Sequence, residues 1–320
     1  MAEDNKKTVL HSEPATAFAR ENSSDGLRVF VAGGARSGND EIYVEEAYRL
    51  GRQIVKMNLR LDFGLSNSGI MGAVARGVVD EWNKRHCGVE VKSPINAVTT
   101  DSYFCLYPQD DKLLQQIGEV ILAKTLEERK QKLLKADFVV FAPGGVGTLD
   151  ELAYDCVAMQ DGFLDVKPFI LYNIDGFFYH LLEYLKQISA KGFAEPLPFI
   201  VVDNSNELEI VFRLLKLRYV DSQDSKTAYG NTRQLIYEIP YFLKKKIDSS
   251  IHVEDLIAEM DNIRANGTEE QQRELDNEIE QAYLEKEIER MYERLAKTGS
   301  DTAVVSEKLT KLKKRRLKWK

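Results

Sequence analysis

The sequence predicts a Rossmann-like α/β domain, a doubly wound parallel sheet, with a C-terminal α-helical extension. Between residues 27 and 220, short runs rich in β-branched residues alternate with longer segments whose apolar residues recur at helical spacing. This alternation is typical of a parallel sheet covered by helices on both faces. Strand-like runs stop after residue 220: residues 221–230 (DSQDSKTAYG) are polar and loop-like, helical patterns follow, and the chain ends in a basic tail. We therefore expect three regions, residues 1–26, 27–220 and 221–320.

Six apolar runs are expected to form the strands of this sheet. They are residues 27–34 (LRVFVAGG), 59–69 (LRLDFGLSNSG), 93–100 (SPINAVTT), 136–145 (ADFVVFAPGG), 167–176 (KPFILYNIDG) and 196–204 (PLPFIVVDN). Helical patterns lie between them, and residues 110–135 are expected to be helical throughout, in two pieces. Ligands of such sheets bind beyond the carboxyl ends of the strands.

The extension is expected to be a helical hairpin. Residues 252–267 have a helical pattern that ends at Asn266 and Gly267, and Thr268 with Gln271 fits a capping box that opens the next helix. One apolar stripe on that helix contains Leu284, Ile288, Met291 and Leu295. Such a stripe indicates packing on the core or on a second subunit, with a free coiled coil as the alternative.

Composition narrows the class of protein. The chain of 320 residues has a net charge of -7, which gives no general electrostatic reason for nucleic-acid binding. No apolar run approaches the roughly 20 residues that span a bilayer, and residues 1–26 resemble a disordered segment and not a secretory signal. We therefore expect a cytoplasmic protein. The basic tail, residues 308–320, is expected to be solvated, with contact to RNA or an anionic surface as the alternative.

The cysteines and histidines do not form a metal-binding pattern. Cys87, Cys105 and Cys156 lack the spacing of metal ligands, and the four histidines are scattered. We therefore expect neither a structural metal nor a disulfide framework.

Three glycine-bearing turns follow predicted strands: residues 32–38 (AGGARSG), 64–72 (GLSNSGIMG) and 143–148 (PGGVGT). In a parallel sheet they fall on one edge, where glycine lets the backbone approach a ligand and a helix N-terminus attracts an anion. Thr148 adds a hydroxyl donor. Neither a dinucleotide fingerprint nor a Walker A loop is present. The turns therefore predict a cradle for a mononucleotide or a sugar phosphate, although any single turn could serve only the connection.

Two acids, Asp150 and Glu151, follow the third turn. Adjacent helical residues point about 100° apart, so only one can face the cradle squarely. Glu151 lies three residues after Thr148 and is expected to point inward, with Asp150 toward solvent or capping the helix. A carboxylate there can stabilise an oxocarbenium-like transition state or orient water, unless it only complements the helix dipole. Arg129 can bind a phosphate or hold a leaving base, or belong to a solvated helix face.

These motifs resemble those of the Lonely-guy (LOG) family, often mislabelled "lysine decarboxylase". PGGVGTLDE matches the PGGxGTxxE signature, and ERK at 128–130, GLSNSGIMGAVARG and KPFILYNIDGFFYHLLEYLKQ resemble the other family motifs. The resemblance covers residues 27–215. It implies a phosphoribohydrolase that releases a free base and ribose 5-phosphate from a nucleoside 5′-monophosphate. It also implies a homodimer or larger homo-oligomer and no cofactor or metal.

By the same resemblance, Arg129 and Glu151 are the catalytic pair. The residues expected to contact substrate and phosphate are Gly34, Ala35, Asn67, Ser68, Gly69, Met71, Lys130, Gly144, Gly145, Gly147 and Thr148. The PGGVGT turn is more similar to the longer nucleotide-nucleosidase branch than to the short plant enzymes. A cytokinin riboside monophosphate and an ordinary purine or pyrimidine monophosphate both remain open as substrates. The alternative is a non-catalytic nucleotide- or molybdenum-cofactor-binding protein.

Overall fold

The computed structural model describes residues 26–87, 91–106, 110–194, 197, 199–218, 225–246 and 252–298, with 307, 310–312 and 314. The expected disordered segment, except for its last residue, and nearly all of the basic tail lie outside these ranges. Among the described helices, none combines the length and apolar character needed to cross a membrane.

Seven parallel strands form one sheet in the order β4-β3-β2-β1-β5-β6-β7. The strands are β1 (Arg28–Ala32), β2 (Arg60–Phe63), β3 (Ser93–Thr100), β4 (Ile117–Ala123), β5 (Phe138–Phe141), β6 (Phe169–Tyr172) and β7 (Phe199–Val202). β1 pairs with β2 on one side and β5 on the other, so that the strand order reverses direction beside β1. This arrangement confirms the predicted Rossmann-like class and sets a topological switch point at the carboxyl ends of β1 and β5.

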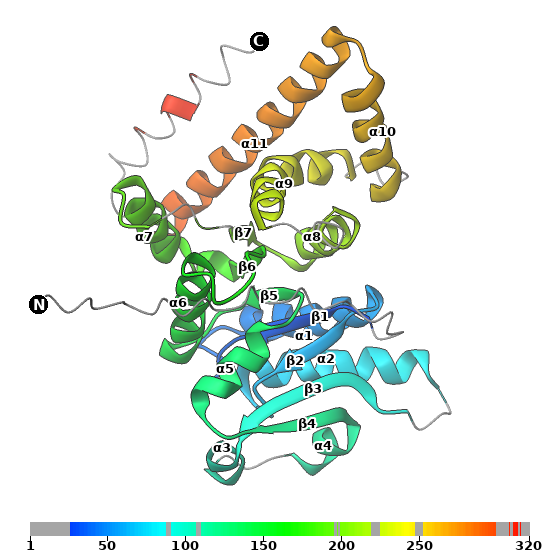
Figure 1. Ribbon diagram of the computed structural model, residues 1–320, viewed down its shortest axis with the longest axis vertical. Helices are drawn as coiled ribbons and strands as arrows, with labels where there is room; N and C mark the ends of the chain where they lie inside the picture. The colour runs from blue at the N-terminus through cyan, green and yellow to red at the C-terminus, as the bar shows by residue number, and fades with distance from the viewer. Residues whose placement is uncertain are drawn as a thin grey trace, which may run out of the picture.

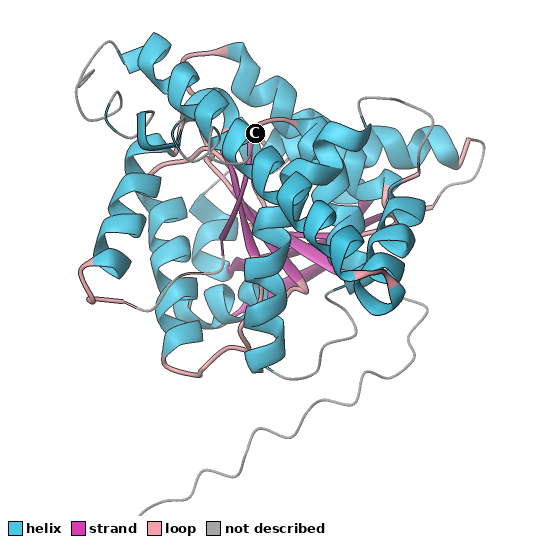
Figure 2. Ribbon diagram, turned by 90° about the horizontal axis from the view of Figure 1, so that it is seen from above, coloured by secondary structure: helices cyan, strands magenta, loops and turns pink. Residues whose placement is uncertain are grey.

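Helices cover both faces of the sheet (Figures 1 and 2). They are α1 (Glu41–Lys56), α2 (Gly69–Arg85), α3 (Asp101–Leu106), α4 (Asp111–Gln116), α5 (Leu126–Leu134), α6 (Val146–Gln160), the 3-10 turn η1 (Ile174–Gly176), α7 (Tyr179–Ala190), α8 (Ser205–Arg218), α9 (Ser225–Lys246), α10 (Val253–Asn266) and α11 (Glu269–Thr298). Val29 and Val31 of β1 pack with residues of α1, α2 and α8, whereas Phe30 and Ala32 pack with residues of α5, α6 and α7. The alternation is the period of two that a strand buried on both faces requires.

The expectation that residues 110–135 are helical throughout is wrong in the middle. Ile117–Ala123 forms strand β4, which pairs with β3 from Asn96 opposite Glu119 to Thr100 opposite Ala123. The strand lies at the edge of the sheet, and its side chains at Val120 and Leu122 are exposed. Because pairing with β3 stabilises this segment and burial contributes little, its apolar pattern does not separate a strand from a helix.

The C-terminal helices pack against the sheet domain. The expected helix end at Asn266 and the capping box are confirmed: the Thr268 N–H donates to Gln271 Oε1 at 2.9 Å, and the Gln271 N–H donates to Thr268 Oγ1 at 3.2 Å. Buried side chains of α9, α10 and α11 belong to the same apolar cluster as α1 and α8; they include Leu235, Phe242, Met260, Leu275 and Ile279. Figure 1 shows α11 running from α7 and β7 to α10. The hairpin therefore packs on the core, but through the first half of α11. In the predicted stripe, Ile288, Met291 and Leu295 form a separate small cluster with Leu312.

Candidate active site

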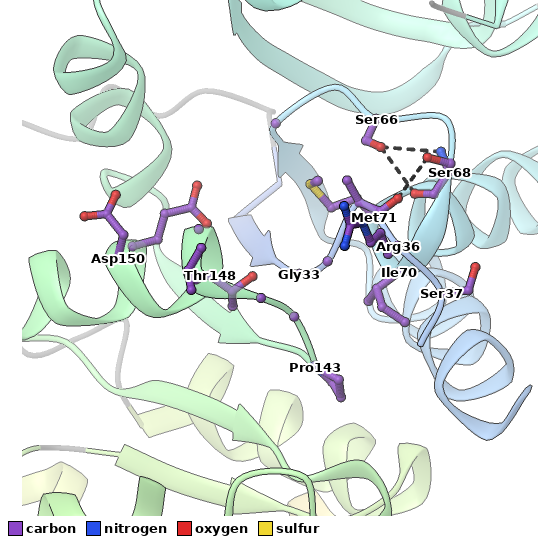
Figure 3. Close-up of a pocket in the computed structure, with 18 of the residues that line it drawn as sticks. Gly33, Arg36, Ser37, Ser66, Ser68, Ile70, Met71, Pro143, Thr148 and Asp150 are labelled. Carbon is purple, nitrogen blue, oxygen red and sulfur yellow. Dashed lines mark hydrogen bonds between the residues drawn. The ribbon is translucent and has the colours of Figure 1, made fainter. Parts of the chain in front are cut away.

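A cavity of about 900 Å³ lies at the carboxyl edge of β1, β2 and β5. The three predicted turns line it: residues 33–38 after β1, 64–68 after β2 and 143–148 after β5. Figure 3 shows Thr148 and Asp150 on α6 across the cavity from Arg36, Ser68 and Met71. The turns thus converge at the switch point of the sheet, where ligands of doubly wound folds bind.

Backbone hydrogen bonds join the three turns to one another. The Gly34 N–H donates to the Pro143 carbonyl at 3.0 Å, and the Gly34 carbonyl accepts the N–H of Ile70 at 2.9 Å. Gly69 has a φ of 61°, and a Cβ there would overlap the backbone of Ala35. Only glycine fits this position without strain, so the second turn can lie directly against the first.

The third turn leads into the N-terminus of α6. Gly145 is the N-cap residue, and the first N–H groups of an α-helix have no acceptor within the helix. A Cβ at Gly145 or Gly147 would meet nothing within 4 Å, so the turn is open on the side of the cavity. Thr148 is buried beside Gly144. Open N–H groups and a positive helix end make this part of the cavity suited to an anion.

Arg129, on α5, is buried and held in one orientation. Its Nε donates to the Val98 carbonyl at 3.0 Å, and its Nη2 donates to the Gly64 carbonyl at 3.2 Å. A Cβ at position 64 would overlap Nη2, so glycine is required for the guanidinium to lie here. The guanidinium carbon is 5.6 Å from the centre of the Tyr103 ring. Arg129 therefore does not belong to a solvated helix face.

Glu151, in the second turn of α6, meets Arg129 inside the cavity. Its Oε1 is 3.5 Å from Arg129 Nη1, and the two side chains are 14% and 10% exposed. Burial raises the pKa of Glu151 above its ordinary value even though the Arg129 guanidinium acts to lower it. Asp150 is 63% exposed and lies 3.2 Å from Lys130 Nζ. The inward and outward orientations of the two acids agree with the sequence prediction.

All but one of the predicted site residues line the cavity. The exception is Gly69, which lies at the start of α2 and shapes the turn. Asn67 and Met71 lie on the side of the second turn, and Lys130 lies beside Asp150 near the N-terminus of α6.

Several side chains that line the cavity were not predicted, among them one cation and three aromatic rings: Arg36, Tyr43, Tyr103 and Phe177. Arg36 lies in the turn of residues 32–38, which was predicted to bind a phosphate. A cation among the small residues of that turn could have been predicted to contact the anion. Phe177 follows the fifth predicted strand. Tyr43 and Tyr103 come from α1 and α3, and only the packing of those helices brings them here. The rings of Tyr43 and Phe177 meet edge-on with centroids 6.0 Å apart.

The fold and the site define a Rossmann-like α/β protein with an anion-binding edge and a buried Arg–Glu pair. Residues 71–210 match the family model described as "Possible lysine decarboxylase". The chain is 30% identical over 217 residues to cytokinin riboside 5′-monophosphate phosphoribohydrolase LOG2 of Arabidopsis thaliana, an alignment that covers 66% of this chain and 94% of the relative. It is 31% identical to LOG7 of the same plant over 220 residues, covering 68% of this chain and 94% of the relative.

The chain therefore belongs to the LOG family. Among solved structures, the molybdenum cofactor carrier protein of Chlamydomonas reinhardtii is similar with a TM-score of 0.43 and 17% identity. That match covers 60% of this chain and 99% of the carrier, and it is too distant to bear on function.

Proposed function

We propose that the protein hydrolyses the N-glycosidic bond of a nucleoside 5′-monophosphate to a free base and ribose 5-phosphate. The observation that carries the proposal is the buried Glu151 carboxylate, 3.5 Å from the Arg129 guanidinium and next to the glycine turn. The names of the related plant enzymes supply the substrate class, a riboside 5′-monophosphate. A cytokinin base and an ordinary purine or pyrimidine are both within the proposal.

In the proposed reaction the phosphate binds at Gly144–Thr148, the residues that line the cavity at the N-terminus of α6, and accepts hydrogen bonds from their backbone N–H groups. The sugar then lies toward Glu151, whose carboxylate stabilises the positive charge that develops on the ribose as the bond to the base breaks. The same carboxylate can orient the attacking water. Arg129, fixed by two backbone carbonyls, donates hydrogen bonds to the leaving base.

A carrier that only binds nucleotide is the competing function. The buried Glu151 argues against it, because a carboxylate beside a bound phosphate repels the ligand and costs desolvation. Catalysis of glycosidic cleavage gives that carboxylate a use. The pair of Arg129 and Glu151 therefore favours turnover.

Incubation with AMP, GMP, CMP, UMP and a cytokinin riboside monophosphate tests the proposal, with free base and ribose 5-phosphate assayed separately. We expect stoichiometric release of both products from at least one nucleotide. Absence of product from all five would contradict the function.

The Glu151→Gln variant tests the role of the carboxylate. It should lose turnover by about 10² or more while still binding nucleotide, because only the transition state requires the charge. Asp150→Asn is the matched control, since its side chain points to solvent, and it should remain active. A Glu151→Gln protein with full activity would show that the role is wrongly assigned.

A further inference from the structure

Helix α11 reaches the carboxyl end of β7 through two cations one turn apart. Arg290 Nε lies 2.9 Å from Asp203 Oδ2, and Arg290 Nη2 donates to the Val201 carbonyl at 2.8 Å. Lys286 Nζ lies 2.7 Å from Glu207 Oε1 and 3.4 Å from Asp203 Oδ2. The four charged side chains are at most 19% exposed. We call Lys286, Arg290, Asp203 and Glu207 the α11 clamp.

The clamp continues into the loop after β6. The second oxygen of Asp203, Oδ1, accepts a hydrogen bond from Asn173 Nδ2 at 2.9 Å. Asn173 is 1% exposed, and its own Oδ1 accepts the N–H of Phe178 at 2.9 Å. A continuous chain of charge-assisted and neutral hydrogen bonds therefore connects Arg290 to the backbone of residues 173–178, which we call the Phe177 turn.

The Phe177 turn requires such support. Asp175 has a φ of 53°, a left-handed conformation that costs free energy in a non-glycine residue. The next helix is attached to α11 as well, because the Tyr179 hydroxyl donates to Glu293 Oε2 at 3.3 Å. The turn is thus held from both of its ends by the same helix of the C-terminal extension.

The turn contributes one aromatic side chain to the cavity. Phe177 lines the cavity and is 44% exposed, with its ring against Tyr43. The faces of aromatic rings bind nucleobases by stacking, whereas the predicted phosphate site lies on a different element, at the start of α6. A displaced Phe177 should consequently weaken contact with the base and leave contact with the phosphate intact.

We propose that Arg290, acting through Asp203 and Asn173, positions Phe177 and thereby sets the affinity and selectivity of the cavity for the leaving base. Arg290 is a positioning residue that lies outside the cavity, and Phe177 is the residue that contacts the base. The ligand assignment rests on the proposed function. The mechanical connection between α11 and the Phe177 turn does not.

Hydrogen exchange of the ligand-free, full-length protein tests the connection. In Arg290→Met, the amides of Gly176, Phe177 and Phe178 should exchange about tenfold faster or more, while amides of residues 33–38 and 144–148 keep their rates. Lys244→Met is the matched control, because Lys244 of α9 forms an exposed ion pair with Glu285 of α11. This variant should change the exchange rate of none of these amides. Arg290→Lys should restore most of the protection. Wild-type exchange of the Phe177 turn in Arg290→Met would overturn the proposal.

Ligand affinity, measured by calorimetry in the Glu151→Gln background, tests the consequence. Arg290→Met and Phe177→Leu should each weaken AMP binding roughly five- to tenfold and change ribose 5-phosphate binding less than about twofold, since only AMP has a base that can stack on the ring. Phe177→Leu alters a half-exposed side chain and does not threaten the fold. Equal weakening of both ligands, or of neither, would overturn the proposal. A Glu151→Gln parent that binds neither ligand would contradict the proposed function. The exchange experiment would still test whether the α11 clamp holds the Phe177 turn.

Discussion

At the scale of single residues, the protonation state of Glu151 controls the proposed chemistry. Burial raises the pKa of this carboxyl, Arg129 and Lys130 lower it, and Asp150 raises it. The net effect raises the pKa above its ordinary value of 4.5. Because the ionised form stabilises the transition state, activity should fall as the pH drops through this raised pKa. The acidic limb of kcat/KM is thus expected above the ordinary range of a glutamate.

Substitutions of Asp150 and Lys130, the two charged neighbours of Glu151, should shift the acidic limb of the pH profile in opposite directions. Asp150→Asn removes a negative charge near Glu151, lowers its pKa and shifts the limb to lower pH. Lys130→Met removes a positive charge and shifts the limb to higher pH. Full pH profiles of kcat/KM for both variants provide the measurement. Shifts in the same direction would show that the titrating group is not Glu151.

Asp155, one turn beyond Glu151 on α6, should make stability depend on pH. Its side chain is 1% exposed and neither carboxylate oxygen has a hydrogen-bond partner in the described part of the chain. Burial raises its pKa from 3.8 to about 6, against an opposing effect of Lys167. The folded state therefore favours the protonated acid, so this contribution to stability is complete below pH 3.8 and is lost as the pH rises through about 6.

Asp155→Asn isolates this effect, because the amide has the same shape and does not titrate. The loss over the whole window is about 3 kcal/mol, of which roughly half falls between pH 5 and pH 8. Urea titrations at pH 5 and pH 8 measure the free energy of unfolding of both proteins. Between these two pH values the variant should become more stable relative to wild type by about that half. A constant difference between the two proteins would contradict the prediction.

At the scale of elements, α6 has two distinct faces. Its inward side carries Glu151 and Asp155, whereas Leu149 and Val157, eight residues apart, are exposed on the outward side. Val146, at the start of the helix, is exposed and lines the cavity. Exposed apolar side chains on the outward side of this helix fit the homo-oligomer that the family resemblance implies. We propose that the outward side of α6 forms the contact between subunits.

Val157→Asp should dissociate the oligomer, because a buried, unpaired carboxylate costs several kcal/mol at an interface. Light scattering after size-exclusion chromatography measures the mass. Leu217→Asp, an exposed position on α8 over the opposite face of the sheet, should leave the mass unchanged. An unaltered mass in Val157→Asp, or a wild-type mass of one chain, would contradict the assignment.

Strands with buried apolar runs were predictable from the sequence, including β7 at one edge of the sheet, whereas the largely exposed edge strand β4 was not. β5 and β6 are fully buried, so their runs of apolar residues identify them. β4 pairs with β3 alone, and most of its side chains are exposed. Its strand conformation therefore depends on the hydrogen bonds to β3 and not on its own apolar pattern. The same distinction holds for the site residues. The glycine turns are local sequence patterns and were predictable, whereas Tyr43 and Tyr103 reach the cavity only because of how their helices pack.

At the scale of the whole molecule, the extension shares the core of the sheet domain. Leu235, Phe242, Met260 and Ile279 of α9 to α11 are buried in one cluster with Val29 and Leu50. Burial of each such side chain stabilises a fold by about 1.5–3 kcal/mol, and a whole domain has only about 5–15 kcal/mol of net stability. The loss of four or more of these side chains is therefore comparable to the total.

A chain truncated after residue 224 should accordingly fail to fold as a soluble, cooperative unit, even though it retains every residue that lines the cavity. The full-length protein should unfold in a single calorimetric transition, because one apolar cluster joins the two regions. Two separate transitions in the intact chain, or a truncated chain that melts cooperatively with its nucleotide affinity intact, would show that the extension is an independent domain. In that case the α11 clamp would have to act across a domain boundary and not within one core.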